Sequence, residues 1–154
     1  MFASTTIMSA FETVNKLVRE WEPRMLPTEL AYQASLTRLL REHLPKAKVE
    51  TEYRHCGTTV DIYVKQPGIF VSSEVFIELK RNLLQKAHLD RLVGQIESLQ
   101  PGKNAIIVIR CGETNPALVT RFEEKYEIRD GTLTIYGEPM TVVVKEVGGK
   151  FAKS

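Results

Sequence analysis

The sequence predicts one α/β domain with a central mixed sheet flanked by helices. The chain has 154 residues, of which 43% are hydrophobic and 26% charged, as expected for one globular domain. Stretches with helical spacing of apolar residues occur together with stretches of strand-like alternation. A long helical pattern separates three neighbouring strands from a fourth, fully apolar one. The chain shows neither an internal repeat nor a low-complexity tract, so we expect a single domain over residues 1–154.

A first amphipathic helix is expected from Ser9 to Glu20. Apolar residues recur there at helical spacing, and Ser9 and Glu12 have the spacing of a capping box. Two prolines follow and separate this helix from the rest of the chain. We therefore expect residues 1–23 to form a helical appendage to the domain.

A second helix is expected to begin directly after Pro27. Thr28 can cap its first turn, and leucines at helical spacing continue to Leu44. Pro45 then ends the helix because it cannot continue the helical hydrogen bonding.

Three strands follow as an antiparallel meander. Alternation of apolar and polar residues indicates strands at about 48–54, 58–65 and 74–80. Proline, glycine and serine residues within 67–73 provide the turn between the last two strands.

The second half of the chain is expected to return to helix and strand in alternation. Pro101 and Gly102 end a long helix, and Asp130 with Gly131 suits a tight hairpin turn. The expected elements are a helix over 84–99, a strand over 105–109, a helix over 116–125 and strands over 132–136 and 140–146. The buried side of the long helix is expected to contain Ala87, Leu92, Val93, Ile96 and Leu99.

Charge and cysteine content limit the partners and the compartment. The formal net charge is only +2, so a nucleic-acid surface requires local clustering of basic residues. Cys56 and Cys111 fit neither a disulfide framework nor a zinc site, and we expect reduced thiols. We also expect a cytoplasmic location without a membrane span, because the sequence shows no secretory signal pattern and no apolar run of about 18 residues.

Polar residues on two neighbouring strands of the meander form the candidate site. Side chains alternate between the two faces of a strand, so the side chain of Asp61 is expected on the other face from those of Val60, Ile62 and Val64. Glu78 and Lys80 would share the face of Asp61 if the two strands form a hairpin. Pairing of Asp61 with Glu78 centres that hairpin between positions 69 and 70, inside the expected turn.

Two opposed carboxylates require something that compensates their charge. Like charges directly across a sheet are destabilising, so a cation, solvent or another register must relieve them. A partly open metal-binding cleft accounts for both acids, and Mg²⁺ suits it because Mg²⁺ takes one or two carboxylates besides water and phosphate oxygens. Lys80 would then orient the attacking water or stabilise charge on the phosphate. The alternative is a solvated sheet face with an Asp61–Lys80 ion pair.

Asp61, the interval after it, and Glu78-Leu79-Lys80 resemble the PD-(D/E)xK motif of restriction-endonuclease-like nucleases and archaeal Holliday-junction resolvases. The expected helix, three strands, helix and strand over about 28–110 also resemble the αβββαβ core of that superfamily. The resemblance implies hydrolysis of phosphodiester bonds in nucleic acid, most often DNA, with Mg²⁺ or Mn²⁺ as cofactor. It also implies a homodimer, because the two strands of a duplex usually require two sites.

The resemblance assigns roles residue by residue. Asp61 and Glu78 match the metal-binding carboxylates, the carbonyl of Leu79 matches a further metal ligand, and Lys80 matches the catalytic lysine. Val60 stands where the motif has its proline, a change that the superfamily tolerates.

Two further catalytic candidates lie on the helices. Glu29 matches an acidic residue that many members carry on the helix before the meander, where it would also bind metal, and Gln95 matches a glutamine on the helix after the lysine. Leu99 departs from subfamilies that have a tyrosine there. Glu50 and Glu52 are alternatives to Glu29 as a third acidic group.

Basic residues near the motif are candidates for contact with nucleic acid. Lys65, Arg81, Lys86 and Arg91 are close to the motif in sequence and could form a cationic rim for a polyanion. Such residues also occur as an ordinary solvated face. The competing function is a catalytically inactive nucleic-acid-binding or assembly module with the same fold.

Overall fold

The computed structural model describes residues 2–55, 57–68, 73–99, 105–126, 132–135 and 138–145. Its helices and strands are, in chain order, α1 (Phe2–Glu20), α2 (Glu29–His43), β1 (Lys48–His55), β2 (Thr58–Gln66), β3 (Ser73–Leu83), α3 (Lys86–Leu99), β4 (Ala105–Thr114), α4 (Pro116–Tyr126), β5 (Thr132–Ile135) and β6 (Glu138–Lys145). The predicted order of helices and strands is confirmed.

The strands form one six-stranded mixed sheet in the order β1-β2-β3-β4-β6-β5. β1, β2 and β3 pair antiparallel as the predicted meander, whereas β4 is parallel to both β3 and β6. β5 returns antiparallel to β6 and forms one edge, and β1 forms the other. The predicted α/β class, with an αβββαβ core from α2 to β4, is therefore confirmed.

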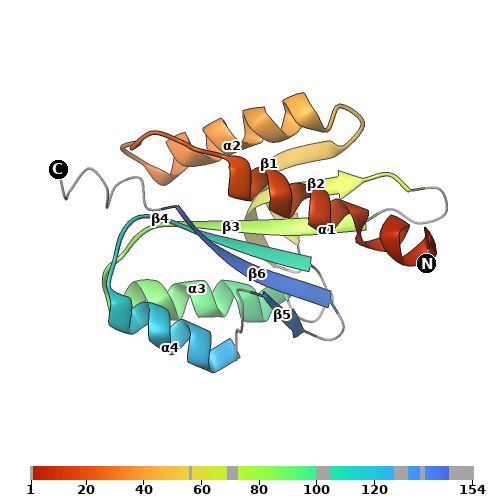
Figure 1. The fold of residues 1–154 in the computed structure, drawn as a ribbon. Coiled ribbons are helices and arrows are strands. Elements are labelled where there is room, and N and C mark those ends of the chain that lie inside the picture. The colour runs from red at the N-terminus through yellow and green to blue at the C-terminus, as the bar shows by residue number, and fades with distance from the viewer. Residues whose placement is uncertain are drawn as a thin grey trace.

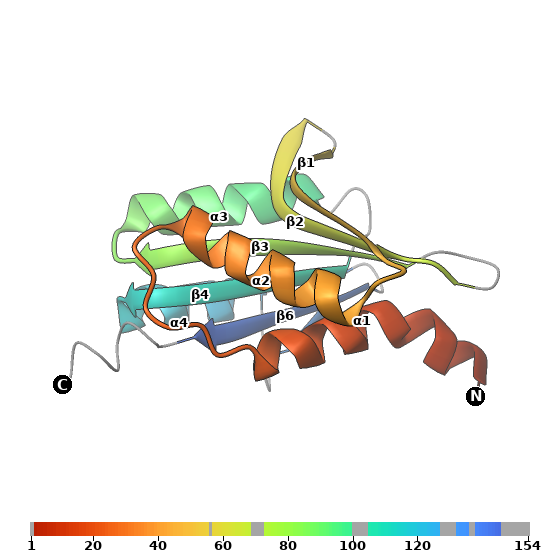
Figure 2. The same cartoon turned by 90° about the horizontal axis from the view of Figure 1, so that it is seen from above.

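Helices cover both faces of this sheet (Figures 1 and 2). α1 and α2 lie on one face and α3 and α4 on the other. Each face has its own hydrophobic cluster, one including Val14, Leu36, Ile62 and Ile107, the other including Phe76, Leu92, Ile96 and Phe122. Because β3 and β4 are covered on both faces, their sequences are nearly continuous apolar runs.

The first helix is part of the core, so the expectation of an appendage is wrong. α1 begins at Phe2, which places the predicted capping residue Ser9 inside the helix. Val14 and Val18 are completely buried and belong to the cluster beneath α2. The apolar stripe of α1 is therefore covered by the sheet.

The connection between α1 and α2 is fixed by side chains. Trp21 Nε1 donates to Ser35 Oγ at 3.1 Å, and the hydroxyl oxygen of Tyr32 accepts from the Leu26 N–H at 3.0 Å. Thr28 caps α2 as predicted, because its Oγ1 accepts from the Ala31 N–H at 3.0 Å. These bonds hold the first turn of α2 in a defined position.

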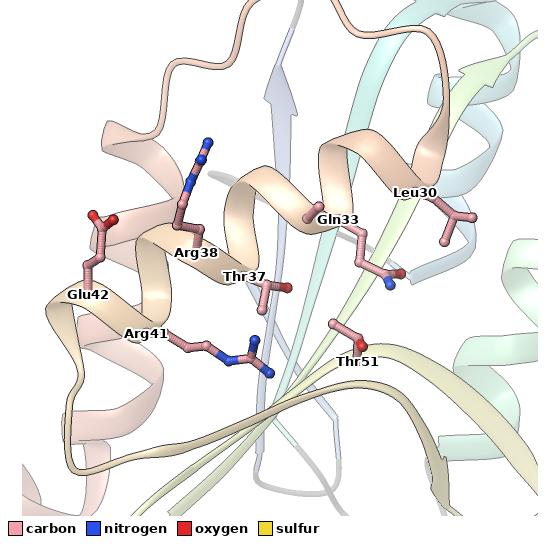
Figure 3. Close-up of a pocket in the computed structure, with 8 residues that line it drawn as sticks. Leu30, Gln33, Thr37, Arg38, Arg41, Glu42 and Thr51 are labelled. Carbon is pink, nitrogen blue, oxygen red and sulfur yellow. The ribbon is translucent and has the colours of Figure 1, made fainter.

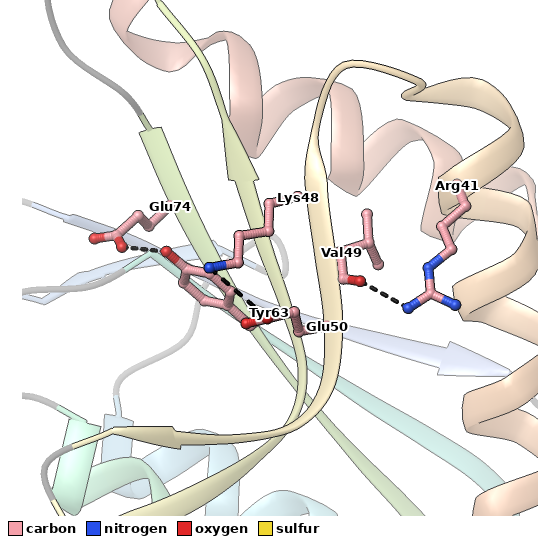
Figure 4. A network of polar contacts seen from close by, with 6 residues as sticks. All are labelled: Arg41, Lys48, Val49, Glu50, Tyr63 and Glu74. Carbon is pink, nitrogen blue, oxygen red and sulfur yellow. Dashed lines mark hydrogen bonds and ion pairs between the residues drawn. The ribbon is translucent and has the colours of Figure 1, made fainter.

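Polar contacts join β1 to α2 and β2 to β3 (Figure 4). Arg41 on α2 donates from Nη2 to the carbonyl oxygen of Val49 at 2.8 Å. Lys48 and Glu50 form an ion pair of 3.7 Å along β1. On the other side of the hairpin, the Tyr63 hydroxyl donates to Glu74.

Other sequence expectations differ in detail. β4 extends beyond the predicted range to Thr114, and the buried side of α3 uses Leu89 where Ala87, which is exposed, was expected. Cys111 is buried and not disulfide-bonded, whereas Cys56 and the predicted turn at 130–131 lie outside the described residues. Among the described helices, none has the length and apolarity needed to span a membrane.

Candidate active site

The candidate site lies where β2 and β3 separate. Their pairing runs from Gln66–Ser73 to Ile62–Ile77, and its next step would place Asp61 opposite Glu78, as predicted. The pairing stops before that step. β3 continues instead beside β4, with Glu78 next to Val108. We call this separation of the two strands the fork.

The backbone is also irregular on the other side of Asp61. β1 and β2 pair at Thr51–Ile62 and again at Tyr53–Val60, without a pair between Glu52 and Asp61. Glu52 has a φ of 52°, in the left-handed region that non-glycine residues rarely adopt. Glu52 therefore lies beside Asp61 along an interrupted part of the sheet.

This irregularity corrects one sequence expectation. Val60 was expected on the same face as Ile62 and Val64, but it packs in the cluster under α3 and α4, with Tyr63. Ile62 and Val64 pack in the cluster under α1 and α2. Strict alternation fails at Asp61 because the strand is twisted between the two interrupted pairings.

Asp61 and Glu78 are joined through each other's backbone. The Asp61 N–H donates to Glu78 Oε1 at 3.4 Å, and the Leu79 N–H donates to Asp61 Oδ2 at 2.7 Å. Both amides lie at the fork, where strand pairing no longer uses them. The two carboxylates therefore replace backbone partners and are held close together.

Burial makes these two carboxylates unusual acids. Glu78 is only 1% exposed, and its Oε2 is buried without a hydrogen-bond partner. Burial, with a further contribution from the charge of Asp61, raises the pKa of Glu78 to about 8. Burial also raises the pKa of Asp61 to about 6, and the charges of Glu29 and Glu52 add to that increase. The pair lacks a compensating positive charge sufficient to keep both acids ionised.

Lys80 on β3 and Glu29 on α2 lie near the two acids and complete the candidate site. Lys80 is 9% exposed and forms an ion pair with Glu29, 4.0 Å between Nζ and Oε2. The same Glu29 oxygen accepts from the Arg81 N–H at 2.9 Å. The alternative of a solvated sheet face with an Asp61–Lys80 ion pair is therefore wrong, because Glu78 and Lys80 are buried and Lys80 pairs with Glu29.

Gln95 is half-buried on α3, and its Oε1 is buried without a hydrogen-bond partner. α3 lies on the opposite face from α2, which carries Glu29. A catalytic role for Gln95 stays a prediction.

The four basic residues proposed as a rim have different surroundings. Arg81 donates from Nε to the Leu26 carbonyl oxygen at 3.3 Å, and Lys86 pairs with Asp90 at 2.9 Å on α3. Lys65 is exposed on β2, about 13 Å along the strand from Asp61. Arg91 is exposed on α3. Their contact with nucleic acid stays a prediction.

The position of Glu52 could have been inferred from the turn between β1 and β2. Gly57 has a φ of 79°, as turn glycines often do, and a hairpin centred between positions 56 and 57 places Glu52 opposite Asp61. The sequence pattern indicates Glu52 only as an alternative to Glu29. The structure instead has both acids near Asp61, as the effect of their charges on its pKa indicates.

The fork suits a divalent cation that uses few protein ligands. Within the described ranges, no three His, Cys, Asp or Glu side chains form a ready metal-binding group. Mg²⁺ requires only one or two carboxylates, since water and phosphate oxygens supply the rest. The buried carboxylate of Glu78 and the half-buried one of Asp61, both with raised pKa values, fit such an ion, as does the unpartnered Oε2 of Glu78.

No protein-family model and no curated protein matches the chain. Among solved structures, SfsA from Pyrococcus furiosus in complex with Ca²⁺ aligns at 13% identity over 76% of this chain and 56% of that one, with a TM-score of 0.41. A repair endonuclease from Pyrococcus abyssi aligns at 16% identity over 80% and 49%, with a TM-score of 0.44. The DNA modification-dependent restriction endonuclease AspBHI aligns at 12% identity over 90% and 32%, with a TM-score of 0.38.

This chain thus spans about half the length of the first two structures and about a third of the last. Its helix-flanked mixed sheet, with two carboxylates and a lysine where β2 and β3 separate, is compatible with a restriction-endonuclease-like fold.

Proposed function

We propose that the chain is a metal-dependent nuclease that hydrolyses phosphodiester bonds in DNA. The observation that carries this proposal is the pair formed at the fork by the half-buried Asp61 and the buried Glu78, with one carboxylate oxygen of Glu78 unpartnered. Two acids without a sufficient counter-charge destabilise a folded protein unless a bound ligand compensates their charge. A divalent cation bound with a phosphate is a ligand of the required charge.

Asp61, Glu78 and the carbonyl of Leu79 would hold Mg²⁺ or Mn²⁺. Leu79 is suitable because its N–H bonds Asp61 Oδ2, and in a strand the carbonyl of a residue points to the same side as its N–H. The bound ion would polarise the phosphate and lower the pKa of a coordinated water. Glu29 contacts the Lys80 ammonium and the Arg81 amide, so we assign it to positioning Lys80.

Lys80 is the group that we assign to the reacting phosphate. Its ammonium is largely buried and is fixed by Glu29, so it presents a positive charge with little freedom to move. A preorganised cation in a partly desolvated site stabilises the charge that develops on phosphate oxygens in the transition state. The same ammonium can donate a hydrogen bond that orients the attacking water.

DNA as substrate, a homodimeric state and a cytoplasmic location are the parts of the proposal that follow from the motif resemblance and from the sequence. A dimer would supply one site for each strand of a duplex. Its mass in solution can be measured by sedimentation at several protein concentrations.

The test is a cleavage assay on single-stranded, duplex and branched DNA and on RNA, with Mg²⁺, Mn²⁺ or EDTA. We expect cutting that requires the metal and is lost in Asp61→Asn and Lys80→Met, variants that preserve side-chain size. A variant of an exposed acid, Glu12→Gln, serves as the control and should cut normally. Binding without cutting under every metal condition would instead support the inactive binding module.

A further inference from the structure

A second site is suggested by a groove between α2 and the edge strand β1 (Figure 3). The groove has a volume of about 520 Å³. Its lining residues are Leu30, Gln33, Ala34, Thr37, Arg38, Arg41, Glu42 and Thr51. Most of them are polar, although this side of α2 approaches the sheet, where apolar residues are usual.

Four hydrogen-bonding side chains converge in the groove. Gln33, Thr37 and Arg41 point from α2 toward Thr51 on β1, whereas the two other charged lining residues, Arg38 and Glu42, point away (Figure 3). All four converging side chains can donate hydrogen bonds, and one of them is a cation. The groove therefore favours an anion.

The floor of the groove contains polar atoms that are expensive to leave buried. Thr37 is 4% exposed and its Oγ1 is buried without a hydrogen-bond partner, and Gln33 is 7% exposed. An unsatisfied buried hydroxyl costs about 1–3 kcal/mol. A valine of the same shape at position 37 would avoid this cost, so the hydroxyl destabilises the free protein locally.

A hydrogen bond from one N–H group holds Arg41 in place, and its guanidinium has further N–H donors. Its Nη2 bonds the Val49 carbonyl oxygen at 2.8 Å, which anchors the guanidinium against β1. A guanidinium has five N–H groups in a fork that matches phosphate oxygens. The anchored side chain can therefore bind a phosphate with a small loss of conformational entropy.

The groove adjoins the fork at two points in the chain. Leu30 follows Glu29, which contacts Lys80, and Thr51 precedes Glu52, which lies beside Asp61. Thr37 and Arg41 lie eight and twelve residues beyond Glu29, or about 12 and 18 Å along the helix axis. This distance corresponds to about four or five nucleotides of a duplex strand.

We propose that the groove binds a backbone phosphate of the same nucleic-acid strand that is cut at the fork, about four or five nucleotides from the scissile bond. The inference rests on the proposed nuclease function and assigns Arg41 and Thr51 to the positioning of that strand. Contacts of this kind fix the register of a nucleic acid without reading its sequence.

The experiment measures the affinity of a fluorescently labelled 20-nucleotide strand and its duplex as a function of salt, in EDTA. We compare Arg41→Gln with Arg38→Gln, which removes the same charge one turn away from a side chain that points out of the groove. Arg41→Gln should weaken binding about tenfold and reduce the slope of log K against log salt by about one. Arg38→Gln should change affinity by no more than about twofold.

Arg41→Gln could fail to fold, because Arg41 anchors β1. In that case Thr51→Val and Thr37→Val, which are expected to fold, provide the test. Thr51→Val is an isosteric change at an exposed position and should weaken binding without changing stability. Thr37→Val should raise the free energy of unfolding of the free protein and leave DNA binding unchanged, because its hydroxyl is buried. Equal DNA affinity for wild type, Arg41→Gln and Thr51→Val would overturn the proposal.

Cleavage by wild type in Mn²⁺ is measured in parallel, so that the two proposals fail separately. If wild type cleaves DNA but Arg41→Gln and Arg38→Gln bind DNA with equal affinity, the groove site is refuted and the nuclease function is retained. Groove-dependent binding without cleavage by any metal refutes the nuclease and retains the groove. If no nucleic acid binds, or if Arg41→Gln changes only the sedimentation mass, the groove is not a phosphate site.

Discussion

Asp61 and Glu78 lie side by side at the fork, and each carboxylate accepts a hydrogen bond from a backbone amide beside the other acid. The strands cannot separate at this position and leave these amides unpaired without a cost in free energy. The carboxylates therefore serve the fold as well as the proposed chemistry. Substitutions at the fork that remove these acceptors should consequently lower stability as well as activity.

The metal-free protein should lose stability as the pH rises from about 4 to 8. Burial raises the pKa of Glu78 to about 8 and that of Asp61 to about 6. In this window the folded state keeps protons that the unfolded chain has released, so the free energy of unfolding falls with increasing pH. Urea unfolding in EDTA at pH 5, 6.5 and 8 measures this dependence.

Glu78→Gln should raise the metal-free stability at pH 8 by on the order of 2 kcal/mol. The variant should also flatten the pH dependence and lose the stabilisation that Mg²⁺ gives to wild type at this pH. Glu12→Gln, at an exposed position of α1, should change none of these values. A pH-independent stability of wild type would contradict the raised pKa values.

Lys80 and Glu29 should differ in their effect on cleavage. Lys80→Met removes the cation assigned to the phosphate and should lower the single-turnover rate about a thousandfold. Glu29→Gln keeps an oxygen that can accept from the Arg81 N–H but removes the charge near Lys80, so we expect a loss of about tenfold. A larger loss in Glu29→Gln than in Lys80→Met would show that Glu29 acts directly on the reaction rather than through Lys80.

Two glycines provide a matched test of the backbone near the site. Gly112 has a φ of 73°, and a Cβ there would lie 2.3 Å from Asn82 Oδ1. Gly112→Ala should therefore cost about 1–2 kcal/mol of unfolding free energy. Gly94 lies on α3 with open space around its Cα, so Gly94→Ala should add about 0.5–1 kcal/mol. Thermal or urea unfolding of both variants compares the two effects.

The packing of α1 can be tested by removing two methyl groups. Val14 is completely buried beneath α2, so Val14→Ala should lower the free energy of unfolding by about 2 kcal/mol. Thr13→Ala changes its exposed neighbour and should leave stability within about 0.5 kcal/mol. Equal stability of the two variants would mean that α1 does not contribute to the core in solution.

Local patterns predicted the pairing of β2 with β3, because alternation and the turn residues both determine the register. They did not predict that the pairing ends at Ile62–Ile77, since this depends on how the twisted strands separate in three dimensions. Nor did they predict the packing of α1, whose apolar stripe fits either an exposed helix or a core helix. The groove beside Arg41 joins residues of a helix and an edge strand that no local pattern connects.

The fork also divides the proposed machinery between two parts of the sheet. Asp61 belongs to the β1–β2 hairpin, whereas Glu78 and Lys80 belong to β3, which is paired with β4 in the centre of the sheet. The spacing between the two acids therefore depends on the angle at which the hairpin leaves the central strands. A ligand that bridges the two acids would fix the orientation of the β1–β2 hairpin relative to the central strands β3 and β4.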